Sequence, residues 1–122
     1  MSYFAVLQLL RPLVNNQVFP NVAPDTATFP HITYQKVGGA SLNYVDKARP
    51  DKRHNRIQVN TWSRSKVEAD ALIKKVEDIL TSAIPNVEVE VYGEAVDDYD
   101  AQVKLYGCRQ DFGIWTLREP KS

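Results

Sequence analysis

The chain has 122 residues and a mass of 13.9 kDa, which excludes two stable domains because each half would bury too small a core. Hydrophobic residues make up 43% and charged residues 25% of the sequence, values typical of a soluble globular protein and not of a wholly disordered one. Fifteen basic and fifteen acidic residues cancel. The chain therefore has no overall electrostatic attraction to nucleic acid or anionic membranes, and any such contact would need a local patch.

The cysteine and histidine content excludes several kinds of site. The single cysteine, Cys108, rules out an internal disulfide and gives no support for a zinc site, and we interpret it as a reduced thiol in a cytosolic compartment. His31 and His54 lie in different segments and lack the spacing of metal ligands.

The apolar run 4–10 is shorter than a membrane span and lacks the features of a signal peptide. We expect neither export nor a membrane partner.

The first third of the chain predicts one helix and two strands. Pro12 limits where the predicted helix, over residues 2–14, can end. The sequence then predicts a turn and a short strand over residues 15–20. Three prolines indicate an extended connection over 20–30, and alternating residues predict a strand over 32–37. The helix is indicated by an apolar stripe at spacings of three and four: Phe4, Leu7, Leu10 and Val14.

A polar stretch over 40–55 predicts a long, mobile loop between two strands, and loops of this length usually have a function or become ordered on binding. One interpretation is a solvated hairpin loop; the other is a loop that meets an acidic partner or passing DNA. Apart from one tyrosine, it lacks the interleaved aromatic residues of a single-strand binder. The candidate interaction residues are Tyr44, Lys47, Arg49, Lys52, Arg53, His54 and Arg56.

The clearest strand and helix follow each other in the middle of the chain. Residues 56–62 alternate, with positions 57, 59 and 61 on one face. Ser65 and Glu68 then match a capping box, in which each side chain binds the other's backbone N–H, and Pro85 closes the segment. The helix behind this cap carries an apolar stripe: Ala69, Leu72, Val76, Ile79, Leu80 and Ala83.

The last third predicts three strands. Residues 87–92 alternate valine with polar residues, and the acidic stretch 97–100 is interpreted as a turn. A strand at 103–105, a turn over 107–111 and a last strand at 112–117 follow, and the tail 118–122 is expected to fray. The whole chain, 1–122, is thus predicted to be a single α+β domain. Its mainly antiparallel sheet of about five strands packs against two α-helices on one face.

Short motifs that suggest chemistry do not assemble into a site. The triplet 111–113 spells the magnesium motif of kinases, and 63–66 spells a serine-x-x-lysine motif, but neither has its companion motifs. The acidic residues of 94–100 lack the glycine and the closing glutamate of an EF-hand loop, so we interpret them as a solvated turn. No set of nucleophile, base and orienting group is present. We therefore predict no catalytic residue, no metal, no cofactor and no small-molecule substrate.

Three stretches together resemble the tail-completion proteins of tailed phages and prophages. They are Pro30-His31-Ile32-Thr33-Tyr34, the strand 56–62 with Ser65 and Glu68-Ala69 behind it, and the closing Arg109-Gln110-Asp111-Phe112-Gly113-Ile114-Trp115. The chain departs from the family at Asn15-Asn16-Gln17, where a glycine-rich turn is common.

This resemblance implies a ring of six subunits in the virion tail, assembled in the host cytoplasm, that caps the tail tube and meets the head-side connector. Its partners would be copies of itself, the tail tube protein and the connector proteins, with DNA passing nearby. The resemblance carries no catalytic residues, and it does not separate a tail terminator from a head-side adaptor. We place the loop 40–55 on the inside or the rim of the ring. The rival interpretation is a small cytosolic adaptor that binds other proteins.

Overall fold

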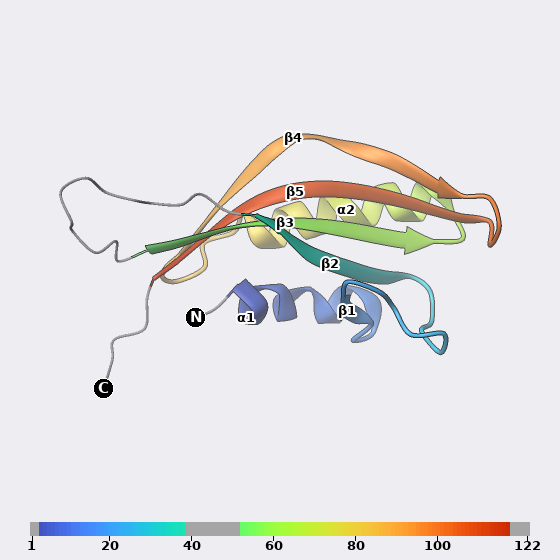
Figure 1. Cartoon of the computed structure of the whole chain (residues 1–122), viewed down its shortest axis with the longest axis horizontal. Helices are drawn as coiled ribbons and strands as arrows, with labels where there is room; N and C mark the ends of the chain where they lie inside the picture. Colours follow the sequence, from blue (N-terminus) through green and yellow to red (C-terminus); the bar gives the residue numbers. More distant parts are fainter. Residues whose placement is uncertain (1–2, 39–51, 118–122) are drawn as a thin grey trace.

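The computed structural model describes residues 3–38 and 52–117, and within the strands the side chains of 52, 53 and 117 are not described. No helix among the described residues is long and apolar enough to cross a membrane. Figure 1 shows the helices on one side of a long, twisted sheet. The elements in chain order are α1 (Tyr3–Leu7), the 3₁₀ helix η1 (Gln8–Val14), β1 (Val18–Pro20), β2 (His31–Gly38), β3 (Lys52–Ser63), α2 (Lys66–Leu80), β4 (Val87–Asp100) and β5 (Leu105–Leu117).

The five strands form one sheet in the order β1-β2-β3-β5-β4. The short β1 runs parallel to β2, and every other neighbouring pair is antiparallel. The predicted α+β class, with a mainly antiparallel sheet of five strands, is confirmed. Because α2 connects β3 to β4 and β5 then returns between them, β4 lies at the outer edge of the sheet.

Two of the predicted turns are wrong, because β4 and β5 are longer than the alternation suggested. Asp97 pairs with Cys108 and Asp100 with Leu105, so the acidic stretch is strand and the connecting turn falls at 101–104. β5 runs without interruption from Leu105 to Leu117. β4 pairs with β5, and β5 pairs with both β3 and β4; the backbone hydrogen bonds of this pairing override the local preference of aspartate and glycine for turns.

The predicted first helix is divided in two. Its α-helical part, α1, is only five residues long and continues as η1, which contains Pro12. Proline has no N–H to donate to the carbonyl four residues back, so a regular α-helix cannot continue through it. The predicted stripe is confirmed at Leu7, Leu10 and Val14, which are buried, whereas Phe4 is 51% exposed.

The predicted cap of α2 is confirmed in its serine half. The Oγ of Ser65 accepts a hydrogen bond from the backbone N–H of Glu68 at 3.3 Å. The carboxylate of Glu68 does not return to the N–H of Ser65; it accepts from the hydroxyl of Ser63, whose oxygen accepts from that N–H at 3.1 Å. Ser63 therefore relays the second half of the box.

The core lies between the helices and one face of the sheet. α2 buries the predicted Ala69, Leu72, Val76 and Leu80 and, in addition, Ile73. Inward-facing residues of three strands complete this core, and those with no exposed surface are Ile32, Ile57, Val59, Phe112 and Ile114. The opposite face of the sheet carries no described helix, so its side chains are available for contacts outside the chain.

Candidate interaction surface

The predicted interaction residues fall into three groups. Tyr44, Lys47 and Arg49 lie outside the described residues. Lys52 and Arg53 begin β3 and pair with Leu117 and Thr116 of β5.

His54 and Arg56 also belong to β3, opposite Trp115 and Gly113. The predicted loop over 40–55 was therefore too long by four residues, because β5 extends far enough to pair with 52–55. Both side chains lie on the helix-free face, since they alternate with the buried Asn55 and Ile57.

On this face His54 joins two aromatic side chains from β4 and β5. Its Nε2 lies 2.8 Å from the hydroxyl oxygen of Tyr92, and its ring packs against Trp115 at a tilt of 40°, with centroids 4.4 Å apart. We call His54, Arg56, Tyr92, Asp111 and Trp115 the outer platform. It spans the three strands β3, β5 and β4, so its shape depends on their register.

Arg56 holds the middle of the outer platform. Its Nε and Nη2 both donate to Oδ2 of Asp111, at 3.0 and 2.9 Å, and its guanidinium lies 4.9 Å from the centre of the Tyr92 ring. The Arg56 and Asp111 side chains are 47% and 22% exposed, so this pair adds little to stability. Its effect is to hold a flat guanidinium in place on the surface.

A glycine allows the outer platform to lie close to the sheet. Gly113 sits beneath Tyr92 and His54; a Cβ there would fall 2.6 Å from Cζ of Tyr92 and 2.7 Å from Nε2 of His54, and would collide with the Tyr92 hydroxyl. Both side chains can therefore cover the backbone only because residue 113 has no side chain.

The surroundings of Tyr92 further favour the neutral form of its phenol. Burial raises the pKa of its phenol, and Glu90 raises this pKa further by charge and hydrogen bonding, while Arg56 acts in the opposite direction. The phenol therefore remains protonated at physiological pH and can donate a hydrogen bond as well as accept one.

A hollow of about 700 Å³ lies at the other end of the same face. Its lining includes Thr33 and Trp62 of the sheet and Phe29 of the connection before β2. The indole N–H of Trp62 donates to Oγ1 of Thr33 at 3.3 Å, and the guanidinium of Arg64 lies 5.3 Å from the centre of the Phe29 ring. The helix-free face thus offers a polar, aromatic platform and a separate hollow.

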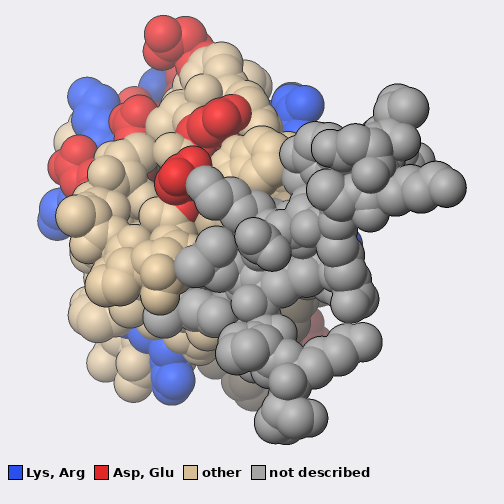
Figure 2. All heavy atoms as spheres, turned by 90° about the vertical axis from the view of Figure 1, so that its left-hand side faces the viewer, with Lys and Arg blue, Asp and Glu red and all other residues tan. Residues whose placement is uncertain are grey.

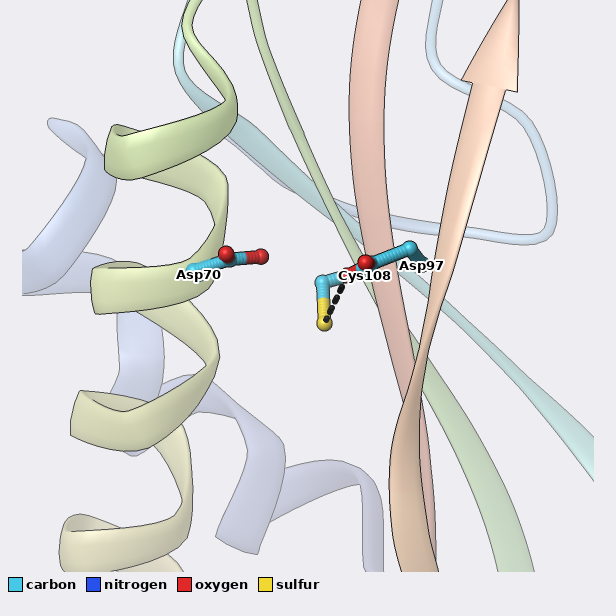
Figure 3. A group of neighbouring side chains, drawn as sticks. All are labelled: Asp70, Asp97 and Cys108. Atoms are coloured by element: carbon cyan, nitrogen blue, oxygen red, sulfur yellow. Dashed lines mark hydrogen bonds between the residues drawn. The ribbon is translucent and has the colours of Figure 1, made fainter.

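On the helix side, three potential metal ligands come together between α2 and β4. One ligand atom each from Asp70, Asp97 and Cys108 lies within 4.8 Å of the others (Figure 3). However, Nζ of Lys66 lies 3.0 Å from Oδ2 of both aspartates. The hydrogen bond to Asp70 raises the pKa of Lys66 most, and the hydrogen bond to Asp97 also raises it. The lysine neutralises one of the two carboxylate charges and occupies an oxygen of each aspartate, so we interpret the group as a lysine-bridged carboxylate pair.

The Cys108 thiol is unsuited to chemistry in this environment. Its side chain is buried and lies 4.0 Å from Oδ1 of Asp97. Burial raises the pKa of the thiol, and the charges of Asp70 and Asp97 raise it further. The thiolate, which is the reactive form, is therefore scarce at neutral pH.

We predict that Cys108 of the folded protein reacts with a thiol reagent at pH 7.5 at least about tenfold more slowly than in the unfolded chain, because both burial and the raised pKa lower the reactive fraction. The reaction can be followed by absorbance, with protein unfolded in urea as the control. Equal rates in the two states would show that the thiol is accessible and ionised.

Sequence reasoning missed Tyr92, Asp111 and Trp115 as candidate site residues. Alternation in β4 does place Tyr92 on the polar face, opposite the valines. The signal was incomplete because the register of β4 on β5, and of β5 on β3, cannot be read from one sequence. Asp111 was assigned to a turn, so its pairing with Arg56 was not foreseen.

Comparison with solved structures supports the fold. A chain from the virion of a native gene transfer agent particle is 13% identical, with 94% of this chain and 91% of that chain covered and a TM-score of 0.63. A crystal structure from Akkermansia muciniphila is 10% identical over 74% of this chain and 43% of that one, and its TM-score of 0.40 supports no argument. No curated protein matches the chain.

Comparison with protein families gives the identity of the chain. The model described as "Tail completion protein gp17" matches residues 5–117, a range that includes every described strand, the outer platform and all the predicted interaction residues, from Tyr44 to Arg56. The three stretches that suggested tail completion from the sequence all lie within this match. The chain therefore belongs to the tail completion protein gp17 family and is a structural protein of the phage tail.

Proposed function

We propose that the chain is one subunit of a six-membered ring that completes the tail tube and joins it to the head-side connector. The single observation that carries the proposal is the one-sided sheet. Its helix face is closed by the core. On the other face the outer platform has no covering layer among the described residues, although the same face is buried at His31 and Thr33. A face of this kind is suited to a protein contact, because little side-chain entropy remains to be lost on binding.

The composition of the outer platform also supports a contact surface. Arginine, tyrosine and tryptophan are the residues that most often dominate the energetics of protein interfaces, and Arg56, Tyr92 and Trp115 lie together here. Copies of one chain form a closed ring when two different surfaces of the chain meet. In our proposal the outer platform does not take part in this closure but faces the tail tube protein or the connector.

The basic run, residues 47–56, forms a second region of contact in this proposal. In the sequence, Lys47 and Arg49 come between β2 and β3. We place this segment at the rim of the ring, where it meets an acidic partner or DNA passing through the opening. Assembly would take place in the host cytoplasm before the tail meets the head.

The test is complementation of a phage that lacks the gene. Since Lys52 and Arg53 are paired residues of β3, the change is confined to residues 44–50, replaced by a Gly/Ser linker of equal length. We expect the wild-type chain to restore joined particles and the linker variant to fold but leave heads and tails separate. Electron microscopy counts the joined particles, and circular dichroism controls for folding.

Two outcomes would contradict the proposal. Joined particles at normal yield without the chain would remove the joining function. Joined particles with the folded linker variant would remove the role of residues 44–50 while leaving the platform as the contact surface.

A further inference from the structure

A hollow of about 450 Å³ lies on the helix side of the sheet, between α2 and the edge strand β4. α2 packs mainly on β3 and β5 and makes little contact with β4, so a gap remains between the helix and this strand. Cys108 and Gln110 of β5 line its floor. Figure 3 shows Asp70 of α2 and Asp97 of β4 on opposite sides of Cys108. We call this hollow the α2–β4 groove.

The walls of the α2–β4 groove are mainly acidic. Their charged side chains are one lysine and four carboxylates, from both α2 and β4: Asp70, Lys74, Glu77, Glu94 and Asp97. The acidic charges outnumber the basic ones even when Lys66, which bridges the two aspartates, is counted. The groove therefore attracts a basic group and repels an acidic one.

One acceptor in this wall has no donor. Lys66 binds Oδ2 of Asp70, whereas Oδ1 of Asp70 is buried and has no hydrogen-bond partner among the described residues. A buried carboxylate oxygen without a donor costs free energy, so a donor supplied from outside the chain would be bound favourably. Lysine and arginine side chains carry donors only and match a lining of carboxylate oxygens.

The strand that borders the groove is also a free edge of the sheet. Among the described strands, β4 has a neighbour on one side only, and it contains six acidic residues and no basic residue. In Figure 2 most of the visible Asp and Glu side chains lie in the upper half, the side along which β4 runs in Figure 1. Alternate backbone N–H and C=O groups of an edge strand point away from the sheet and can pair with an added strand.

Charges on an edge strand, and a bulge such as the one between Tyr92 and Val96, also protect it from unwanted pairing. Protection accounts for the acidic residues of β4 itself. It does not account for Asp70 and Glu77, which α2 contributes to the groove. Pairing of β4 with β4 of a second copy is disfavoured, because acidic side chains would then face each other.

We propose that a basic, extended segment of another virion protein adds to the β4 edge and places a lysine or arginine side chain in the α2–β4 groove. Side chains of an added strand alternate between the two faces of the sheet, so every second one lies on the helix side. Its charged head would donate to Oδ1 of Asp70 and to the carboxylate of Glu94. This contact goes beyond the proposed function, since it requires neither the ring nor the outer platform.

A peptide-binding measurement tests the charge of the groove. The probe is a fluorescent seven-residue peptide of alternating threonine and arginine, and binding is followed by fluorescence anisotropy. Glu77→Gln with Glu94→Gln should weaken binding about tenfold or more. The matched control, Asp25→Asn with Asp78→Asn, removes two exposed charges that do not line the groove and should bind as the wild type does. Equal affinities of the two double variants would overturn the proposal.

Methylation of the peptide backbone tests the added strand. Two versions of the peptide carry N-methyl groups on alternate residues, one set on the even and the other on the odd positions. An added strand turns only one of these sets toward β4, so one version should lose about tenfold in affinity and the other should bind nearly as the parent does. Equal affinities of the two versions would show that charge alone holds the peptide, which would overturn strand addition.

NMR locates the peptide on the protein. On titration, the largest amide shifts are expected in Gly93–Asp97 and on the α2 face that holds Asp70 and Glu77. Shifts confined to the outer platform would overturn the proposal. Self-association of the chain that the peptide reverses would also overturn it, because the occupant would then be a second copy.

The groove contact and the joining function fail in different ways. Complementation at normal yield by the Glu77→Gln, Glu94→Gln chain would overturn the role of the groove in the virion and leave the joining function intact. Joined particles without the chain would overturn the joining function itself. Thermal melting checks the fold of each variant, and Glu94→Lys alone, at an exposed position, gives a second test of peptide binding.

Discussion

Replacing Phe112 with alanine is expected to destabilise the protein by about 3–5 kcal/mol. Phe112 lies in β5, the strand paired on both sides, opposite Ile57 of β3 and Val91 of β4, and none of its side chain is exposed. The core around it joins both helices to the sheet, so a cavity there affects every layer. Total stabilities of small domains are about 5–15 kcal/mol, and the variant should therefore lose a large fraction of its stability.

Urea unfolding monitored by circular dichroism measures this loss. The matched control is Phe4→Ala, which removes the same atoms from a side chain that is 51% exposed and should cost less than about 1 kcal/mol. If the two variants lost equal stability, Phe112 would not be a central core residue, and the one-sided arrangement of the sheet would be in doubt.

Replacing Gln110 with leucine is expected to cost about 2 kcal/mol, although leucine is a similar size and more apolar. Gln110 is buried on β5, and its Nε2 donates to the carbonyl oxygens of Tyr92 and Gly93 at 2.7 and 3.0 Å. These two carbonyls belong to the bulge in β4, where Gly93 adopts a φ of 70°. In the leucine variant the carbonyl oxygens of Tyr92 and Gly93 lose the hydrogen-bond donor of Gln110, so the conformation of the bulge is no longer fixed by it.

The control is Gln58→Leu, the same change on the helix-free face. Gln58 donates to Oδ1 of Asp111 at 3.4 Å and is only partly buried, so its loss should cost less than about 0.5 kcal/mol. Hydrogen exchange at β4 gives a second measurement, and faster exchange is expected around the bulge in the Gln110 variant alone. Equal stability of the two leucine variants would mean that the amide of Gln110 does not hold the bulge.

The elements that were predicted well have strong local signals. Ser65 caps α2, and Leu72 and Val76 lie on its buried stripe, because a helix face follows from spacing alone. The strand around Ile57 and Val59 was equally clear, because its alternation matches a sheet with one buried face.

The elements that were predicted poorly depend on pairing between distant parts of the chain. Asp97 and Asp100 favour turns locally, yet they are strand residues because β5 lies beside them. His54 was placed in a loop for the same reason, since the start of β3 is ordered by the end of β5, more than fifty residues further along the chain. Local sequence does not contain this information.

The candidate site shows the same division. His54 and Arg56 were noted as part of a basic run, which is a property of the sequence. Their partners Tyr92 and Asp111 come from other strands and meet them only through register. His54 and Arg56, at the end of the basic run, thus have fixed partners on the sheet.

Electron cryo-microscopy of the head–tail junction, in particles of the phage that encodes this chain, tests the proposed ring most directly. We predict a closed ring of six copies of this five-stranded fold between the tail tube and the head-side connector. A junction that lacks this fold, or that contains it outside a ring, would contradict the proposal.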